Sequence, residues 1–273
     1  MFICNDVEMV NYAVTCGTER IFVDLEIYGK HERQGHRNTV ISNHTIDDVK
    51  KVSSVIGNSD LMVRVNPLHE NSESEINNVI LNGADILMLP MFHSAEELKK
   101  FVDLVDERAC IIPLIETPKA IENFSEICSV DGIAEFYFGL NDLHLALGLN
   151  FMFELLIDGT VERVAAACRE ANIPFGFGGI ARMDEGLVPG ALILAEHLRL
   201  GSSAVILSRT FHRAGKNLEG RLSGADFAGE VRKLREYESS LINRSKSEIE
   251  TDRQKLIDCI SDVLKQYPRK GKY

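Results

Sequence analysis

Charged side chains stand at or just after the ends of several short apolar segments of this 273-residue chain. They are Asp24, Glu26, Arg64, Glu116 and Asp142. If the apolar segments are parallel strands, their carboxyl ends meet at one edge, where clustered carboxylates repel one another unless a cation neutralises them. A divalent metal ion or a guanidinium group meets that need. The residues therefore predict a metal site in an acidic active site.

Glu116 and Asp142 are the predicted metal ligands. Glu116 ends one apolar segment and Asp142 follows the next, so adjacent strands would bring the two carboxylates together. Two carboxylates, with water and substrate oxygens in the remaining positions, suit Mg²⁺ or Mn²⁺. A single carboxylate after a strand is more often a helix cap or a surface ion pair, so the prediction depends on their joint placement.

Arg64 lies inside the apolar segment 61–66, so its charge must point into the active site or toward a partner. A guanidinium beside a metal ion can hold a substrate carboxylate through paired hydrogen bonds. The alternative is an ion pair with Asp24 or Glu26 on the neighbouring strand. The two roles can coexist.

The elements that position these residues follow from the alternation of short apolar runs with amphipathic stretches of helical period, which repeats about eight times. The expected strands are 2–4, 20–26, 61–66, 85–90, 110–116, 135–140, 173–179 and 203–208. The expected helices between them are 6–16, 45–57, 72–82, 94–107, 118–129, 159–171 and 189–198. An open doubly wound sheet would show fewer strands and a glycine-rich turn after the first. The pattern therefore predicts an α/β fold, a single (β/α)8 TIM barrel, with its active site at the carboxyl ends of the strands.

The barrel is expected to span residues 1–223, and residues 224–273 form a C-terminal helical extension. Apolar residues recur at helical spacing between positions 227 and 241 and again between 249 and 263. This stripe must be covered by the barrel's own flank or by another subunit. We therefore expect a homo-oligomer.

Composition narrows the choice of function. The net charge of −11 opposes binding to nucleic acid, whose phosphates attract basic proteins. Hydrophobic residues make up 45% of the chain, but no run is long enough to predict a membrane span. The start of the chain carries acidic residues where a signal peptide needs basic ones, and the six cysteines are scattered singly. We expect a cytoplasmic protein with reduced thiols that acts on a small molecule.

Several motifs resemble the HpcH/HpaI aldolase and citrate lyase β-subunit family, part of the phosphoenolpyruvate/pyruvate barrel superfamily. The matching segments are VDLE followed by GKHERQ (23–26 and 29–34), MVRVNP (62–67), LIETPKAIENFSEI (114–127) and FGLNDLHLALGL (138–149), with a weaker match in GADILMLPMFHSAEEL (83–98). They occur in the family's order, and the IET and GxxDL segments with their spacing are the most specific.

The resemblance implies a metal-dependent carbon–carbon lyase, of the class II aldolase type, that acts through an enolate of pyruvate or a related 2-oxo acid. It implies that Glu116 and Asp142 bind the metal ion and that Arg64 binds the carbonyl oxygen of the substrate. The substrate carboxylate is expected on the backbone amides of the turn formed by Gly139, Leu140, Asn141 and Asp142, as amides at a helix start can bind anions.

The chain departs from the family at one catalytic position. The aldolase branch has a histidine directly after its D-x-E segment, and this chain has Ile27 there. His31 and His36, in a loop rich in basic residues, are the predicted substitutes, acting beside Asp24 and Glu26. The loop 29–38 is also expected to close over an anionic substrate as a lid.

Three other interpretations remain open from the sequence. The DLE segment is close to the citrate lyase branch, which predicts an acyl-CoA or other acyl-thioester substrate. A phosphorylated substrate could bind near the seventh and eighth strands, and the residues that favour it are Gly176, Gly178, Gly179, Ser202 and Ser203. A barrel without catalytic activity, serving as a binding protein, is the third.

Overall fold

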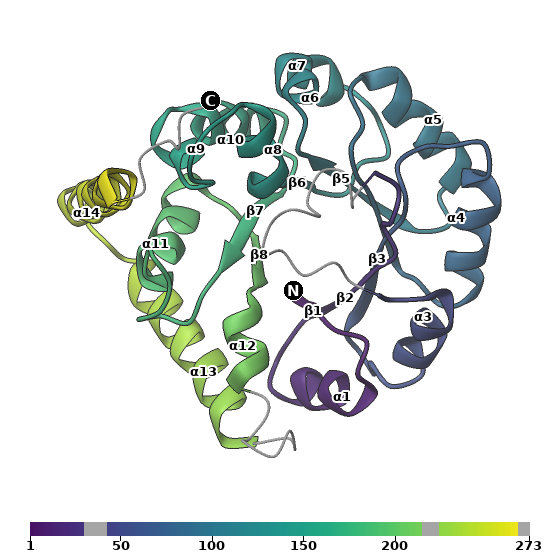
Figure 1. Cartoon of the computed structure of the whole chain (residues 1–273), viewed down its shortest axis with the longest axis horizontal. Helices are drawn as coiled ribbons and strands as arrows, with labels where there is room; N and C mark the ends of the chain where they lie inside the picture. Colours follow the sequence, from purple (N-terminus) through teal and green to yellow (C-terminus); the bar gives the residue numbers. More distant parts are fainter. Residues whose placement is uncertain (30–42, 215–223, 267–273) are drawn as a thin grey trace.

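Eight parallel strands close into a barrel in sequence order (Figure 1). The computed structural model describes residues 1–29, 43–214 and 224–266. The strands are β1 (Phe2–Ile3), β2 (Arg20–Asp24), β3 (Asp60–Arg64), β4 (Ile86–Leu89), β5 (Cys110–Ile115), β6 (Phe136–Phe138), β7 (Phe175–Ile180) and β8 (Ala204–Leu207). β1 pairs with both β2 and β8, which completes the closure. The predicted TIM barrel is confirmed.

Helices surround the barrel. They are α1 (Val7–Thr15), α3 (Ile46–Ser53), α4 (Ser72–Leu81), α5 (Ala95–Val105), α6 (Pro118–Glu122), α7 (Phe124–Ile127), α8 (Leu140–Ala146), α9 (Glu154–Ile157), α10 (Thr160–Glu170), α11 (Gly190–Leu200), α12 (Arg209–Ala214), α13 (Gly224–Leu241) and α14 (Lys246–Gln266). Among these helices, none combines the length and the apolar character that a bilayer crossing requires.

The helix predicted over 118–129 is two helices, α6 and α7, that meet at Asn123. The Asn123 side chain donates from Nδ2 to the carbonyl of His93 at 3.1 Å, in the loop before α5. Asparagine is a weak helix former whose amide competes for backbone partners, so this contact accounts for the break. Pro118 occupies the first turn of α6, as predicted.

The centre of the barrel is filled by alternate residues of its strands, including Phe22, Met62 and Tyr137. Tyr137 is fully buried, and its hydroxyl donates to the carbonyl of Gly178 at 2.6 Å and accepts from the amide of Ile206 at 3.0 Å. Because both polar contacts are made within the barrel, this interior is a packed core and not a channel.

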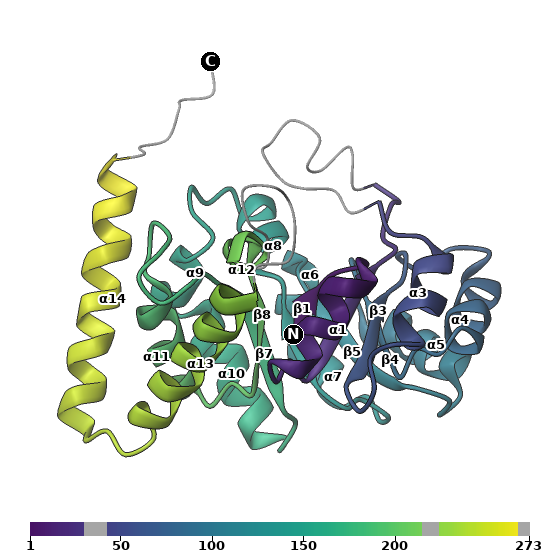
Figure 2. The same ribbon diagram turned by 90° about the horizontal axis from the view of Figure 1, so that it is seen from below.

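The two C-terminal helices have different places. α13 contacts α11, α12 and α1 and completes the ring of helices, whereas α14 stands outside the ring against α11 (Figure 2). The apolar residues of α14, Leu256, Ile260 and Val263, are buried within the single chain. The apolar stripe predicted from the sequence is thus covered by the barrel's own flank, and the homo-oligomer stays a prediction.

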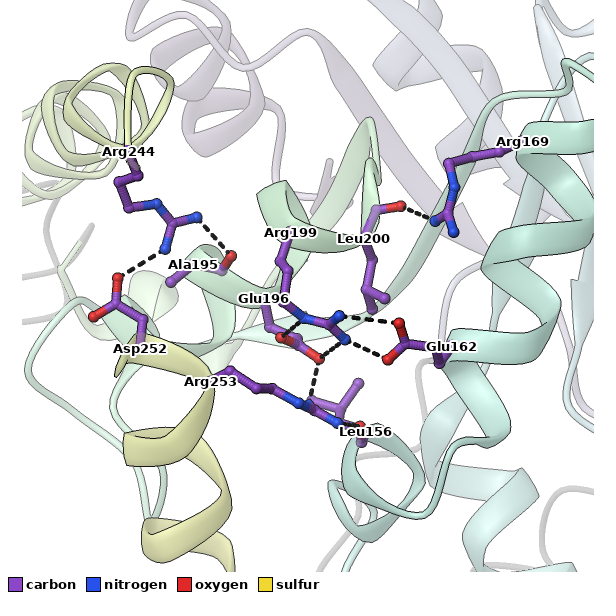
Figure 3. A network of polar contacts seen from close by, with 10 residues as sticks. All are labelled: Leu156, Glu162, Arg169, Ala195, Glu196, Arg199, Leu200, Arg244, Asp252 and Arg253. Atoms are coloured by element: carbon purple, nitrogen blue, oxygen red, sulfur yellow. Dashed lines mark hydrogen bonds and ion pairs between the residues drawn. The ribbon is translucent and has the colours of Figure 1, made fainter. Parts of the chain in front are cut away.

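An ionic network attaches α14 to the ring (Figure 3). Glu196 on α11 accepts from Arg199 at 2.8 and 2.9 Å and from Arg253 of α14 at 2.5 Å. Arg199 also pairs with Glu162 of α10, and Arg253 donates to the carbonyl of Leu156 at 2.8 Å. Removing one member of such a network leaves a buried charge without compensation, so the network fixes how α14 sits.

Candidate active site

Asp24 and Arg64 stand directly opposite each other in the β2–β3 register. Arg64 donates from Nε to Oδ1 of Asp24 and from Nη2 to Oδ2, both at 2.8 Å, in a bidentate ion pair. Its Nη1 lies 3.5 Å from Oε2 of Glu26. The ion pair considered from the sequence is therefore present. These three residues, with Glu116 and Asp142, form what we call the mouth of the barrel.

The pKa of Arg64 reflects these neighbours. Burial alone would lower it, but the charge and hydrogen bonds of Asp24 and the charges of Glu26 and Glu116 raise the pKa above its ordinary value. Arg64 is therefore a permanent cation with a fixed orientation. The contact of Nη1 with Glu26 is longer than a hydrogen bond, so that nitrogen keeps the capacity to donate elsewhere.

Glu116 follows β5 and is 2% exposed. Its Oε1 accepts from the backbone amide of Met91 at 3.1 Å, and Met91 takes a left-handed conformation, with φ of 55°. A non-glycine residue in that region is strained, and such strain is often found at functional sites. Gly139, at the end of β6, is required here because a Cβ would lie 2.8 Å from both Cβ and Oε2 of Glu116.

The Glu116 carboxylate is not neutralised by its surroundings. Burial is the largest cause that raises its pKa, to about 8, and the charges of Asp142 and Glu26 act in the same direction against Arg64 and the Met91 amide. Asp142, in the first turn of α8, is 9% exposed. Burial of the two carboxylates near each other, with a raised pKa at Glu116, fits a hard divalent cation, which would replace the proton on Glu116.

A metal ion in this site would have few protein ligands. Among the residues that the structure describes, no three His, Cys, Asp or Glu side chains are grouped so as to hold a metal ion. A site with the two carboxylates of Glu116 and Asp142 leaves its other positions to water and substrate oxygens. Mg²⁺ and Mn²⁺ tolerate that arrangement, whereas structural zinc sites do not.

The amides expected to bind the substrate carboxylate are not equivalent. The amide of Gly139 donates to the carbonyl of Ile115 at 2.9 Å and belongs to the sheet, so it is not available to a substrate. Leu140, Asn141 and Asp142 lie in the first turn of α8. The prediction is thereby narrowed to these three amides.

The residues predicted for a phosphate site do not meet. Gly176 lies against Tyr137, whose ring would be 2.5 Å from an added Cβ, so this glycine serves packing in the barrel. Ser202 and Ser203 precede β8 and therefore lie at the opposite end of the barrel from the mouth. There Ser202 contacts His197 Nδ1 at 2.8 Å and Ser203 donates to the carbonyl of Phe175. The prediction of one phosphate site formed by these glycines and serines is wrong. The serines precede β8, whereas Gly178 and Gly179 lie near the carboxyl end of β7.

Two polar residues beside the mouth, His44 and Asn66, make contacts that the sequence does not predict. His44, just before α3, accepts the backbone amide of Asp24 on Nδ1 at 3.0 Å. The neighbouring strand β1 ends at Ile3, so the histidine takes the place of a strand partner for Asp24. Asn66, just after β3, accepts the amides of Ile27 and Tyr28. Both contacts join a side chain to a distant backbone group, which sequence spacing does not reveal.

The predicted histidines His31 and His36 lie outside the described residues, as does most of the predicted lid loop 29–38. Their role as acid or base therefore stays a prediction.

A cavity of about 410 Å³ lies at the other end of the barrel, between α11 and α13. Its arginines have acidic partners: Arg20 pairs with Glu135 at 2.7 Å, and Arg235 pairs with Glu19 and Glu238. Compensated charges of this kind are typical of a stabilising face. The mouth, where the carboxylates outnumber the cations, is therefore the candidate active site.

Comparison with known proteins identifies a family for the chain. The family model of HpcH/HpaI aldolase/citrate lyase matches residues 2–186, which include all five residues of the mouth. The chain belongs to the HpcH/HpaI aldolase/citrate lyase family. Membership supports a lyase-type activity. No curated protein sequence matches the chain significantly.

Solved structures of the HpcH/HpaI family share the fold. An HpcH/HpaI aldolase from Desulfitobacterium hafniense DCB-2 is 18% identical, with a TM-score of 0.59 over 76% of this chain and 84% of that one. An HpcH/HpaI aldolase/citrate lyase family protein from Burkholderia cenocepacia J2315 is 14% identical, with a TM-score of 0.60 over 88% and 94%. The citrate synthase SbnG is 16% identical, with a TM-score of 0.57 over 76% and 84%. At these identities the likeness concerns the fold.

Proposed function

We propose that the protein is a Mg²⁺- or Mn²⁺-dependent carbon–carbon lyase that makes or breaks a bond next to an enolate of pyruvate or a related 2-oxo acid. The observation that carries the proposal is the pair of buried carboxylates, Glu116 with its raised pKa and Asp142, beside a fixed guanidinium. Family membership supports the lyase class. We also propose that the substrate is a small molecule and that the protein is a homo-oligomer located in the cytoplasm.

Arg64 would stabilise the charge that appears during the reaction. When the bond between the α- and β-carbons of the 2-oxo acid breaks, its electron pair forms the C=C bond of the enolate and the carbonyl oxygen becomes negative. The other fragment loses its hydroxyl proton and leaves as a carbonyl compound. Nη1 of Arg64 would donate to that oxygen, since Nε and Nη2 are held by Asp24. A donor fixed before the reaction stabilises the transition state without reorganising.

Glu116 and Asp142 would hold the metal ion, and the amides of Leu140, Asn141 and Asp142 would orient the substrate carboxylate. The metal ion, when bound, would supply Lewis-acid stabilisation of the same developing charge. Asp24 and Glu26 would keep Arg64 in place, because both carboxylates lie on its guanidinium group. This division of roles explains why the mouth has more carboxylates than the metal ion needs.

Enolate formation can be tested without knowing the second substrate. An enzyme that stabilises the pyruvate enolate should exchange the methyl protons of pyruvate with deuterium from D₂O, which proton NMR measures. We expect exchange with Mg²⁺, and loss of exchange with a chelator and in Glu116→Gln. Absence of exchange with either metal, together with failure to cleave 4-hydroxy-2-oxo acids, would contradict the proposal.

A further inference from the structure

Asn66 holds the backbone that carries Glu26. Its Oδ1 accepts from the amide of Ile27 at 2.9 Å and from the amide of Tyr28 at 3.0 Å. The side chain is buried and lies two residues after Arg64 on the same segment. We propose that Asn66 is a positioning residue for Arg64, acting through Glu26; this inference rests on the function proposed above.

The orientation of the Asn66 amide is itself determined. Glu75 on α4 accepts with Oε1 from both Nδ2 of Asn66, at 2.7 Å, and its backbone amide, at 3.1 Å. An acceptor at Nδ2 settles which end of the asparagine is the carbonyl. Oδ1 therefore faces the two amides, and Asn66 can hold them as an acceptor.

The hydrogen bonds and one aromatic contact form a closed network from Asn66 through Glu75, His69 and Tyr28 back to Asn66. Oε2 of Glu75 lies 3.0 Å from Nε2 of His69, and His69 accepts the amide of Asn71 on Nδ1. His69 therefore carries a proton on Nε2 and donates it to Glu75. The His69 ring packs edge to face on Tyr28, with centroids 4.8 Å apart. Tyr28 is thus held through both its amide and its ring.

This network affects the mouth because the β2–β3 sheet does not hold Glu26. The last backbone contact between the two strands is the one in which Leu25 donates to the carbonyl of Arg64 at 2.9 Å. Past that point the backbone of Glu26 is held from two sides. Oδ1 of Asp24 accepts the amide of Glu26 at 3.2 Å, and Asn66 accepts the next amide. The Glu26 carboxylate then faces Nη1 of Arg64, the nitrogen assigned to the substrate.

Asn66→Ala removes the acceptor of both amides. We expect kcat for pyruvate proton exchange to fall about 10- to 100-fold, a usual loss when a residue behind the reacting groups is removed, with Mn²⁺ affinity unchanged within about twofold. The matched control is Asn77→Ala, which makes the same substitution on the outer face of α4 and breaks a 2.6 Å contact with Arg108. The control should retain full kcat.

A double-mutant cycle separates positioning from a general structural role. If Asn66 acts through Arg64, then adding Asn66→Ala to Arg64→Met should change the remaining activity by less than about threefold. Glu75→Gln provides a milder variant, with an expected severalfold loss of kcat, should Asn66→Ala fail to fold.

The outcomes are distinguishable. Wild-type exchange with unchanged kcat in Asn66→Ala, or losses that multiply in the double mutant, would overturn the inference alone. Absence of exchange in the wild type would overturn the proposed function and this inference with it.

Discussion

Glu116 at the mouth and Glu196 on α11 are equally buried, each 2% exposed, but their surroundings are opposite. Glu196 accepts hydrogen bonds from two guanidinium groups, those of Arg199 and Arg253 (Figure 3). Glu116 accepts from one backbone amide, and burial, together with the charges of acidic neighbours, raises its pKa to about 8. Burial alone therefore does not distinguish a structural carboxylate from a functional one.

The difference lies in what completes each site. Around Glu196 the cations belong to the chain, so the group is finished when the protein folds. Around Glu116 the excess of negative charge is stable only with a proton or an added cation, and such sites cost folding energy. The comparison predicts that changes at Glu116 affect activity and that changes at Glu196 affect stability.

The largest effect is expected for Glu116→Gln and Asp142→Asn. Each keeps the side-chain volume but replaces an anionic ligand by an amide that binds a hard cation poorly. Losing the metal ion removes several kcal/mol of transition-state stabilisation, so activity should fall about a thousandfold or more. Pyruvate proton exchange measures the loss, and urea unfolding without metal should show equal or greater stability than the wild type.

Glu196→Gln should show the reverse. It leaves Arg253 and Arg199 short of a buried counter-charge, so we expect a loss of about 3 kcal/mol in the free energy of unfolding. Activity of the folded protein should stay within about twofold. Glu162→Gln is the control, because Glu162 is 44% exposed and its ion pair should contribute less than about 1 kcal/mol. Equal losses of unfolding free energy in the two variants would show that the burial of Glu196 does not strengthen its ion pairs.

Arg64→Lys should lower kcat about a hundredfold and leave Mn²⁺ affinity nearly unchanged. Lysine keeps the charge but cannot pair with both oxygens of Asp24 while donating to the substrate. Steady-state kinetics with titrated Mn²⁺ separates the two effects. A variant that loses metal affinity instead would place Arg64 in the metal site and not on the substrate.

The last effect concerns the pH dependence of stability. The pKa of Glu116 is raised from 4.5 to about 8, so between these values the folded state binds more protons than the unfolded state. The stability of the metal-free protein should therefore fall as pH rises through this window, by up to about 1.4 kcal/mol per unit. Subtracting the unfolding free energies of Glu116→Gln from those of the wild type isolates this dependence. A difference that stays flat across the window would mean that Glu116 is already compensated.

The barrel could be predicted from the sequence because strands that are buried on both sides appear as continuous apolar runs. The runs of β4 and β5 are typical. α8, α9 and α12 were not predicted. α8 buries Leu140, Asp142, Leu143 and His144, so it lacks the one-sided apolar stripe by which a helix is recognised. The place of α13 in the ring depends on its contacts with α1, across the whole chain.

The site residues that follow strands, such as Glu116 and Asp142, could be predicted, because position in a barrel strand determines the end at which a side chain lies. The roles of Asn66 and His44 could not be predicted, since each depends on a backbone amide some 20 to 40 positions away. The same limit applied to Glu196, whose partner Arg253 comes from the last helix.

The most direct test of the contrast is the binding of Mn²⁺, measured by calorimetry in the presence of oxalate, which mimics the pyruvate enolate. The wild type and Glu196→Gln should each bind one ion per chain with the same affinity, and Glu116→Gln should show no binding. Binding by Glu116→Gln with wild-type affinity would contradict the account.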